Sequence, residues 1–363
     1  MSSARIPVVE IETLAQLDEH LAAAASLHGC VVQSVDLADR RDALAAVPVS
    51  GAIFLGCPMP RRVEDELTDR GGLVFPQLPH LPFNPYRADL YSGPELYDGI
   101  DGGYAKTFDG RVYAWYSAHG ASPALPAGLA MALHDQAVSD ALDQALAGID
   151  PRRLVSVMGG HAVGRGDSGY RRGAQLGAAL ATGGFTVMTG GGPGLMEAVN
   201  LGARLADAPD AMDGALDRLA AAPDTTNIAA WVIAALAVAA ACPPVSPSFG
   251  IPTWFYGHEP PNVFPAHIAK YFSNALREDV LLNRAEGGIV ILPGAAGTVQ
   301  EIFQCATRDY YAPTAGLVAP VVLVGRQYWT AELPAWPLLR ALGENRAMGE
   351  RIALVDTVAE AVE

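Results

Sequence analysis

Three short stretches combine glycine with polar residues in a way that would let a protein bind a phosphate group: "VMGGHAVGRGDSG" (157–169), "VMTGGGPGLME" (187–197) and "ILPGAAGTVQE" (291–301). Each begins as an apolar run typical of a buried strand and continues into a helical pattern. A helix N-terminus offers free N–H groups and a partial positive charge, and glycine lets the backbone approach a ligand closely. One such loop is common as an ordinary strand-to-helix turn, whereas three at one sheet edge favour an anion-binding site.

The third stretch also contains a carboxylate, Glu301, and two interpretations of it remain open. The spacing Thr298-x-x-Glu301 before an apolar run matches a capping box, in which Thr298 caps the helix and Glu301 reaches back to it. Alternatively, Glu301 points across the loop into a binding site. Arg277, seven residues before Arg284 in a predicted helix, then pairs with Glu301 or a ligand if its face lines the crevice, and is a solvated surface residue if it does not.

Other polar residues near the loops also have both a functional and an ordinary interpretation. Arg165, Arg171 and Arg172 flank the first loop, where they would either add positive charge to it or form a solvated face. His161 lies inside the first loop, in a position suited to contact a ligand. His258 follows a predicted strand and is a second candidate of this kind.

Several chemistries are excluded by residues that the chain lacks. No GxxxxGK[ST] sequence is present, and neither of the only two lysines, Lys106 and Lys270, lies in a glycine loop, which excludes a P-loop NTPase. A dinucleotide fingerprint would need glycine at the position of Leu195. The histidines and the four cysteines show no zinc-binding spacing, so we expect no metal site.

The composition indicates a large apolar core in a strongly acidic chain. Of 363 residues, 50% are hydrophobic, and the formal net charge of −15 at pH 7 argues against a nucleic-acid polymer or an anionic membrane as partner. Scattered cysteines, and a beginning without the apolar core of a signal peptide, favour a cytoplasmic location. The apolar stretch at 228–242 is shorter than the ~20 residues that span a bilayer, so we expect a buried or interface helix there.

The order of predicted elements indicates two domains. Residues 1–147 are expected to form a smaller α/β domain, with strands in "CVVQSVDL", "GAIFLGC" and "GGLVF" and then a long irregular loop. Residues 148–363 are expected to form a Rossmann-like, doubly wound parallel sheet with a helical insertion at about 204–245. Its ligands would bind at the carboxyl ends of the strands. These strands are predicted in "RLVSVMGG", "FTVMTGGGPG", "FGIPTWF", "GGIVILPG" and "APVVLVG".

Together, the second and third loops resemble the paired signatures of the LOG (Lonely Guy) family, whose members were long mislabelled as lysine decarboxylases. The first signature is matched by Gly190, Gly191, Gly192, Gly194, Met196 and Glu197, and the second by Pro293, Gly294, Gly297, Thr298 and Glu301. The resemblance covers about residues 153–311 and includes "SGYRRGAQLGAALATGG" and "GHEPPN". Two residues depart from it: Ala295 replaces the second glycine of PGGxGT, and Glu278 follows Arg277 where the family has a lysine.

The resemblance implies a Rossmann-like homodimer or larger homo-oligomer that hydrolyses the N-glycosidic bond of nucleoside 5′-monophosphates to a free base and ribose 5-phosphate. Some members of the family act on cytokinin nucleotides. Glu301 and Arg277 would be the catalytic residues, and no cofactor would be needed. A non-catalytic nucleotide sensor or carrier on the same fold is the alternative, which the two departures motivate. The candidate substrate-binding residues are Gly160, His161, Gly191, Gly192, Gly194, Gly294, Ala295, Ala296, Gly297 and Thr298.

Overall fold

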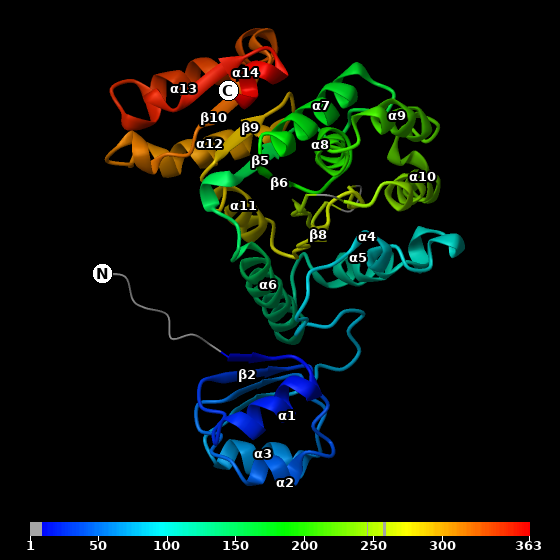
Figure 1. Cartoon of the computed structure of the whole chain (residues 1–363), viewed down its shortest axis with the longest axis vertical. Coiled ribbons are helices and arrows are strands. Elements are labelled where there is room, and N and C mark those ends of the chain that lie inside the picture. The colour runs from blue at the N-terminus through cyan, green and yellow to red at the C-terminus, as the bar shows by residue number, and fades with distance from the viewer. Residues whose placement is uncertain (1–8, 245, 257–258) are drawn as a thin grey trace. The chain divides into compact units, whose positions relative to one another are not determined.

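The computed structural model describes residues 9–244, 246–256 and 259–363, so His258 lies outside the described residues. The chain forms two compact units (Figure 1): Met1–Asp89 with Ser122–Ala141, and Leu90–Ala121 with Leu142–Glu363. This division differs from the expected domains at 1–147 and 148–363, because residues 90–121 and 142–147 belong to the second unit.

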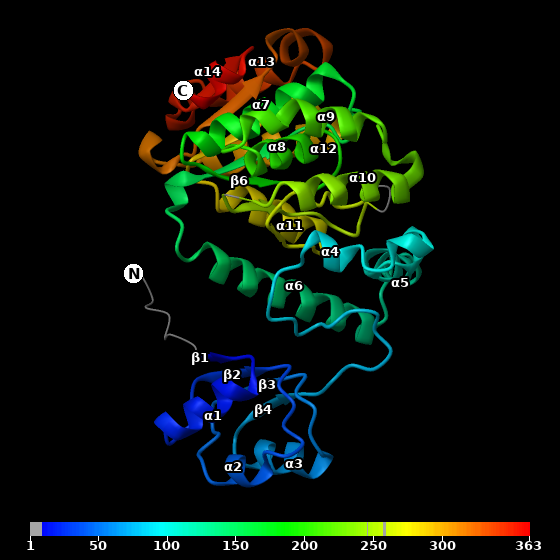
Figure 2. The ribbon, with the colours of Figure 1, turned by 45° about the vertical axis from the view of Figure 1, so that its right-hand side comes forward.

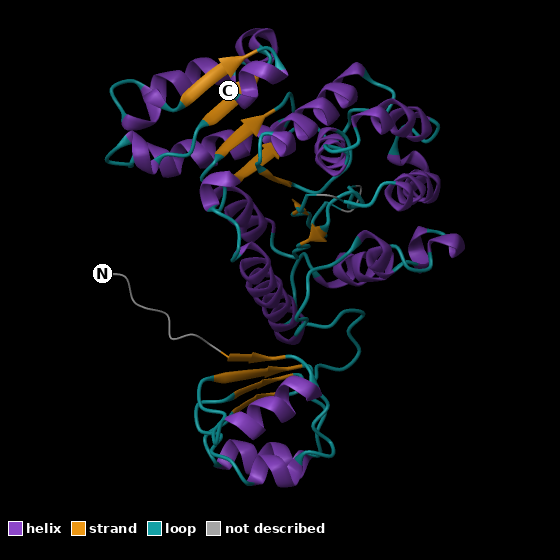
Figure 3. Ribbon diagram, in the orientation of Figure 1, coloured by secondary structure: helices purple, strands orange, loops and turns teal. Residues whose placement is uncertain are grey.

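The first unit is a parallel sheet covered by helices on one face (Figure 3). Its strands follow the order of the chain, so each crossover helix returns to the same face, where Val32, Phe54 and Leu67 form part of the buried core. The predictions placed three of the four strands, and β1 is additional. The strands are β1 (Val9–Ile11), β2 (Cys30–Gln33), β3 (Ile53–Leu55) and β4 (Leu73–Phe75), and the crossover helices are α1 (Leu14–Ala23), α2 (Arg41–Ala45) and α3 (Arg61–Asp69).

The second unit is built on a seven-stranded sheet in which all neighbouring strands are parallel, in the order β11-β10-β9-β5-β6-β7-β8. The α/β fold class expected from the sequence is therefore confirmed. Five of these strands lie in the predicted segments, and the two edge strands β8 and β11 are additional. The strands are β5 (Leu154–Met158), β6 (Thr186–Thr189), β7 (Ser248–Gly250), β8 (His267–Ile268), β9 (Gly288–Ile291), β10 (Val321–Val324) and β11 (Ile352–Val355).

Helices cover both faces of this sheet. On one face, α7 (Ser168–Thr182), α8 (Leu195–Arg204) and α14 (Val358–Val362) pack on alternate apolar residues of the strands, such as Val157 and Val290. On the other face lie α11 (Asn274–Asn283), α12 (Ala296–Tyr310) and α13 (Ala335–Gly343). Ser156 of β5 fixes α11 there by donating its hydroxyl to the carbonyl oxygen of Leu281 at 2.6 Å.

Two further helices, α9 (Met212–Ala220) and α10 (Ile228–Ala241), follow α8 in the chain and precede β7. They lie next to each other (Figure 2). The apolar α10 buries Trp231, Val232, Ala235 and Val238 inside the unit. Within the described parts of the chain, no single helix has the length and apolar character needed to cross a membrane. Only the pair Pro209–Ala220 and Thr225–Ala241, which bends by 65°, meets those two criteria jointly.

Residues 90–121 form an arm that contains α4 (Gly93–Leu96) and α5 (Phe108–His119), and a buried ion pair attaches this arm to the second unit. Asp109 of α5 is fully buried and accepts from Lys270 Nζ at 2.5 Å, from Trp254 Nε1 at 2.8 Å and from Tyr104 Oη at 2.8 Å. The ammonium group of Lys270 also lies 4.9 Å from the centre of the Trp254 ring. Tyr104 lies in the arm, whereas Lys270 and Trp254 lie in the rest of the second unit. The contacts of Asp109 with both parts explain why the arm belongs to this unit.

We predict that Lys270→Met destabilises the protein by about 3–5 kcal/mol, because it leaves the Asp109 carboxylate buried without its counter-charge. Chemical denaturation followed by circular dichroism measures this change. Lys106→Met, at the exposed second lysine, is the control and should stay within about 0.5 kcal/mol of the parent. The double change Lys270→Met with Asp109→Leu should recover much of the loss, and equal stability of Lys270→Met and the parent would contradict the assignment.

Candidate functional site

The three glycine loops meet where the winding of the sheet reverses. Strands β5 and β9 are neighbours, although the chain runs outward from β5 through β6 to β8 before it returns to β9. Parallel α/β sheets bind ligands outside the carboxyl ends of the strands at such a reversal. The loops follow β5, β6 and β9, so all three lie at this carboxyl edge.

Gly160 in the first loop joins the other two through its own backbone. Its N–H donates to the carbonyl oxygen of Pro293 in the third loop at 2.9 Å, and its carbonyl oxygen accepts from the N–H of Leu195 after the second loop at 3.1 Å. Gly194 packs so closely on this junction that a Cβ there would lie 2.6 Å from the carbonyl oxygens of Gly160 and His161. The structure therefore brings Gly160, Gly194 and the Pro293–Gly294 turn together.

The second loop is held by side chains from outside the glycine motif. The N–H of Gly191, which has φ +69°, donates to Thr189 Oγ1 at 3.0 Å. Asn262 is fully buried; its backbone N–H donates to the carbonyl oxygen of Gly191 at 2.9 Å and its amide to that of Gly192 at 3.2 Å. Sequence reasoning did not single out Asn262, and its only signal was its place in "GHEPPN".

The capping-box interpretation of the third loop is wrong. Helix α12 already begins at Ala296, so Thr298 lies inside its first turn, and no side chain caps the helix. A Cβ at Gly294 would clash with the Thr298 hydroxyl, which is turned back over the loop. The capping residue is Ala295, whose φ of −105° is open to any residue, so the methyl group at this departure from the family fits without strain.

The amino end of α12 presents unused backbone donors. The first of its backbone hydrogen bonds is donated by Val299 to the carbonyl oxygen of Ala295 at 3.0 Å. The N–H groups of Ala296, Gly297 and Thr298 precede that bond and therefore have no acceptor within the helix. Residues 295–297 are exposed, so this end of a 15-residue helix is open to an anion.

Glu301 instead faces a buried arginine. Its Oε1 lies 3.6 Å from Nη1 of Arg277 on α11, and Glu278 Oε1 lies 3.4 Å from the same nitrogen. The three side chains are buried, so Arg277 is not the solvated surface residue of the alternative interpretation. Its Nη1 also lies 3.4 Å from the position of a Cβ at Gly190, which places the guanidinium group beside the second loop.

This group of side chains, Glu301, Glu278 and Arg277 with nearby Glu259, holds more carboxylates than cations. Burial, together with the negative charges of Glu278 and Glu259, raises the pKa of Glu301 to about 8, although Arg277 opposes the shift. Burial also raises the pKa of Glu278, again against Arg277. Among the described residues, Glu278 Oε2 and Arg277 Nε have no hydrogen-bond partner. These shifts favour retention of a proton by the carboxylates at neutral pH.

His161 lies at the open side of this group, where its Nδ1 is 3.0 Å from Glu259 Oε1. The hydrogen bond to Glu259 raises the pKa of His161, and partial burial opposes it. Glu259 Oε2 lies 3.5 Å from the position of a Cβ at Gly192, so this pair borders the second loop. Sequence reasoning did not select Glu259 because it stands outside both glycine signatures.

The arginines that flank the first loop do not share one role. Arg165 is buried and forms a two-pronged pair with Glu197, from Nε to Oε2 at 3.1 Å and from Nη2 to Oε1 at 2.5 Å, while its guanidinium lies 4.5 Å from the Trp231 ring. The buried carboxylate of Glu197 is therefore paired with Arg165 and lies away from the exposed surface of the glycine loops. Arg171 is exposed and pairs with Asp213.

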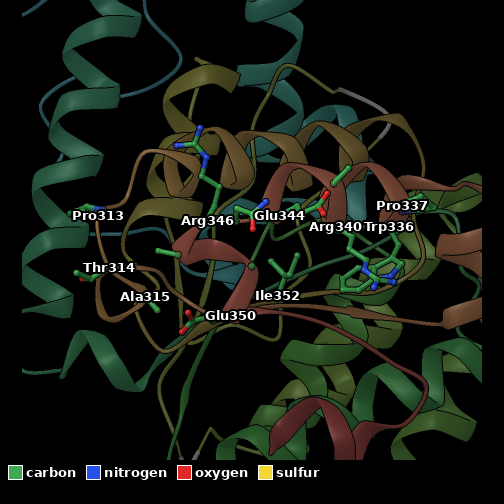
Figure 4. Close-up of a pocket in the computed structure, with 15 residues that line it drawn as sticks. Pro313, Thr314, Ala315, Trp336, Pro337, Arg340, Glu344, Arg346, Glu350 and Ile352 are labelled. Carbon is green, nitrogen blue, oxygen red and sulfur yellow. The ribbon is translucent and has the colours of Figure 1, made fainter.

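A large hollow of the second unit lies elsewhere. It has a volume of about 980 Å³ and lies before β10 and β11, at the amino ends of these strands, with Arg340, Arg346 and Glu350 among its lining residues (Figure 4). The glycine loops stand at the opposite edge of the sheet, so this hollow does not belong to the site. In the described ranges, no cluster of histidine, cysteine and acidic side chains is suited to hold a metal ion.

Comparison with known families finds similarity over the first two glycine loops. The family model described as LDcluster4, SLOG cluster4 family, matches residues 152–210, which include β5, α7, β6 and α8. The SLOG superfamily includes the LOG proteins, but the match is not to LOG proteins specifically. No curated protein matches the chain.

Two solved structures are similar to the chain, each with 15% sequence identity over 58% of this chain and 92% of the other. One is the molybdenum cofactor binding protein from the phototrophic bacterium Rippkaea orientalis, with a TM-score of 0.36. The other is the molybdenum cofactor carrier protein MCP from Chlamydomonas reinhardtii, with a TM-score of 0.34. The chain thus has a Rossmann-like α/β fold whose first two glycine loops are similar to those of the SLOG cluster4 family.

Proposed function

We propose that this protein hydrolyses the N-glycosidic bond of nucleoside 5′-monophosphates, releasing a free base and ribose 5-phosphate. The observation that carries the proposal is the position of Glu301: this buried carboxylate lies 3.6 Å from Arg277, one helical turn from the exposed amino end of α12. A phosphate held by the amides of residues 296–298 would place the attached ribose within reach of a carboxylate on the same helix.

The chemistry follows from the charge that develops on the sugar. As the bond from C1′ to the base nitrogen breaks, its electron pair leaves with the base and the ribose becomes oxocarbenium-like. Ionised Glu301 stabilises that positive charge and takes a proton from the water whose oxygen bonds to C1′. Glu301 then releases this proton, which the base nitrogen gains directly or through solvent, so that the carboxylate is regenerated. Arg277 orients Glu301, and phosphate binding far from the reacting bond fixes the ribose.

The direct test is to incubate the protein with AMP, GMP, CMP and isopentenyl-AMP and to separate the products by chromatography. We expect free base and ribose 5-phosphate in equal amounts from at least one nucleotide. The matching nucleosides should react far more slowly, because they lack the phosphate that the α12 amides would bind. If no free base is released from any nucleotide, even with enzyme in stoichiometric amount, the proposal is contradicted.

Glu301→Gln should retain nucleotide binding and lower kcat by about 100- to 10,000-fold, because the amide cannot accept the proton from water. Binding is measured by calorimetry and turnover by release of base. Gln300→Ala, at the exposed neighbouring position on α12, is the matched control and should keep parent activity. Parent-like turnover in Glu301→Gln would remove Glu301 from the reaction.

The pH dependence gives a further prediction. Since burial and the neighbouring carboxylates raise the pKa of Glu301 to about 8, kcat/KM of the parent should increase with pH up to about that value. Glu278→Gln removes one of the negative charges that raise this pKa, so the increase should occur at lower pH. An unchanged pH profile would show that Glu278 does not influence the reacting group.

A second candidate function is a non-catalytic nucleotide sensor or carrier. It is favoured by one observation: Glu278 follows Arg277 at the position where the family that the chain resembles has a lysine. A crystal soaked with AMP that shows the intact nucleotide, together with equal affinity in the parent and Glu301→Gln, would support this candidate. Measurable release of base would exclude it.

A further inference from the structure

A second cavity of about 620 Å³ lies at the carboxyl edge of the same sheet, on the face covered by α7 and α14. The carboxylates around Arg277 lie with α11 and α12, which cover the opposite face, so this cavity is separate from the proposed catalytic site. The volume is within the range of about 300–1,000 Å³ that is usual for small-molecule sites. Its apolar lining comes from several elements: Leu176, Leu195, Leu292, Val324 and Ala361.

The mouth of the cavity is polar and carries one cation without a counter-charge. Asp356 is already engaged: its carboxylate lies 3.2 Å from Arg326 Nε and accepts from the Arg326 N–H at 2.8 Å. Arg172 of α7 also lines the cavity, and its Nη1 has only a 3.4 Å hydrogen bond to Ser168 Oγ. No carboxylate in the described part of the chain forms an ion pair with Arg172, so its guanidinium is available to an anion.

We propose that this cavity binds a small amphipathic carboxylate, with its apolar body between α7 and α14 and its carboxylate at Arg172. An apolar interior with one charged group at the rim complements such a molecule and disfavours fully polar ligands. A neutral or cationic molecule of the same length would leave the guanidinium unpaired or repel it. The volume of the cavity suits a free small molecule.

A ligand in this cavity would contact the junction of the three glycine loops at Gly160. Leu195 and Pro293 both line the cavity, and their backbone groups are the two partners of Gly160. A ligand packed against Leu195 and Pro293 would restrict the movement of all three loops, so it would act as an effector of the proposed catalytic site. This coupling rests on the proposed function, whereas the binding itself does not.

The test is a fluorescence titration of the full chain with 8-anilinonaphthalene-1-sulfonate, an apolar aromatic anion, followed by displacement with ten-carbon competitors. We expect one probe site per chain, displaced by decanoate at least about fivefold more effectively than by decan-1-ol or decylamine. Arg172→Gln should weaken decanoate binding about fivefold. Arg171→Gln, the adjacent exposed position whose side chain does not line the cavity, is the control and should bind as the parent does.

Ala359→Trp, at an exposed position of the lining, should fill the cavity and abolish the probe site while leaving the thermal midpoint unchanged. Gln175→Trp, on α7, serves the same purpose if the first variant does not fold. Parent-like decanoate binding in Arg172→Gln, or a retained site in the folded tryptophan variant, would overturn the proposal. So would sedimentation showing that a second copy covers the cavity and excludes the probe. The titration needs no turnover, so its result is independent of whether hydrolysis is found.

Discussion

The candidate site depends on the two backbone hydrogen bonds of one residue, Gly160. Its N–H and its carbonyl oxygen engage the third loop and the start of α8, respectively, so three segments that are distant in sequence share a single junction. No side chain is needed for this, and a Cβ on the neighbouring Gly194 would lie 2.6 Å from the carbonyl oxygen of Gly160. Displacement of this junction would shift the third loop, and with it the open end of α12, relative to Arg277 on α11, although neither helix contains Gly160.

Charge is the second constraint on this edge of the sheet. Glu278 and Glu301 face one buried arginine, Glu259 adds its charge nearby, and a bound phosphate would bring further negative charge. The structure meets the excess by holding protons: the ordinary pKa of Glu301 is 4.5, and in the folded chain it is about 8. Between these values the folded state keeps a proton that the unfolded chain has released, so this group makes the protein less stable as the pH rises toward 8.

The sequence was sufficient for the fold class, because strands such as β5 and β9 are apolar runs followed by a glycine loop. It was insufficient for β8, which has two residues, and for β1 and β11, because no glycine loop follows them. The start of α12 was misjudged because the glycine loop, and not a side-chain cap, sets where that helix begins.

The roles of individual site residues were harder to predict than the elements that carry them. From the sequence, Arg165 was expected either to add charge to the first loop or to form a solvated face. In the structure it is buried and pairs with Glu197, which is 32 residues away in the chain. Asn262 and Glu259 come from an irregular segment, where no periodicity indicates which side chains turn inward. Such residues become visible only when the chain is folded, because their partners are set by topology and not by local spacing.

The burial of Lys270 has a practical consequence for the chemistry of the protein's surface. The chain has only two lysines, and this one is 2% exposed within its ion pair, which leaves Lys106 as the single accessible lysine amine of the folded protein. Amine-directed reagents would therefore modify side chains almost exclusively at Lys106. That residue lies in the arm, three positions before Asp109. A fluorophore attached there would therefore report whether the arm is packed against the rest of the second unit.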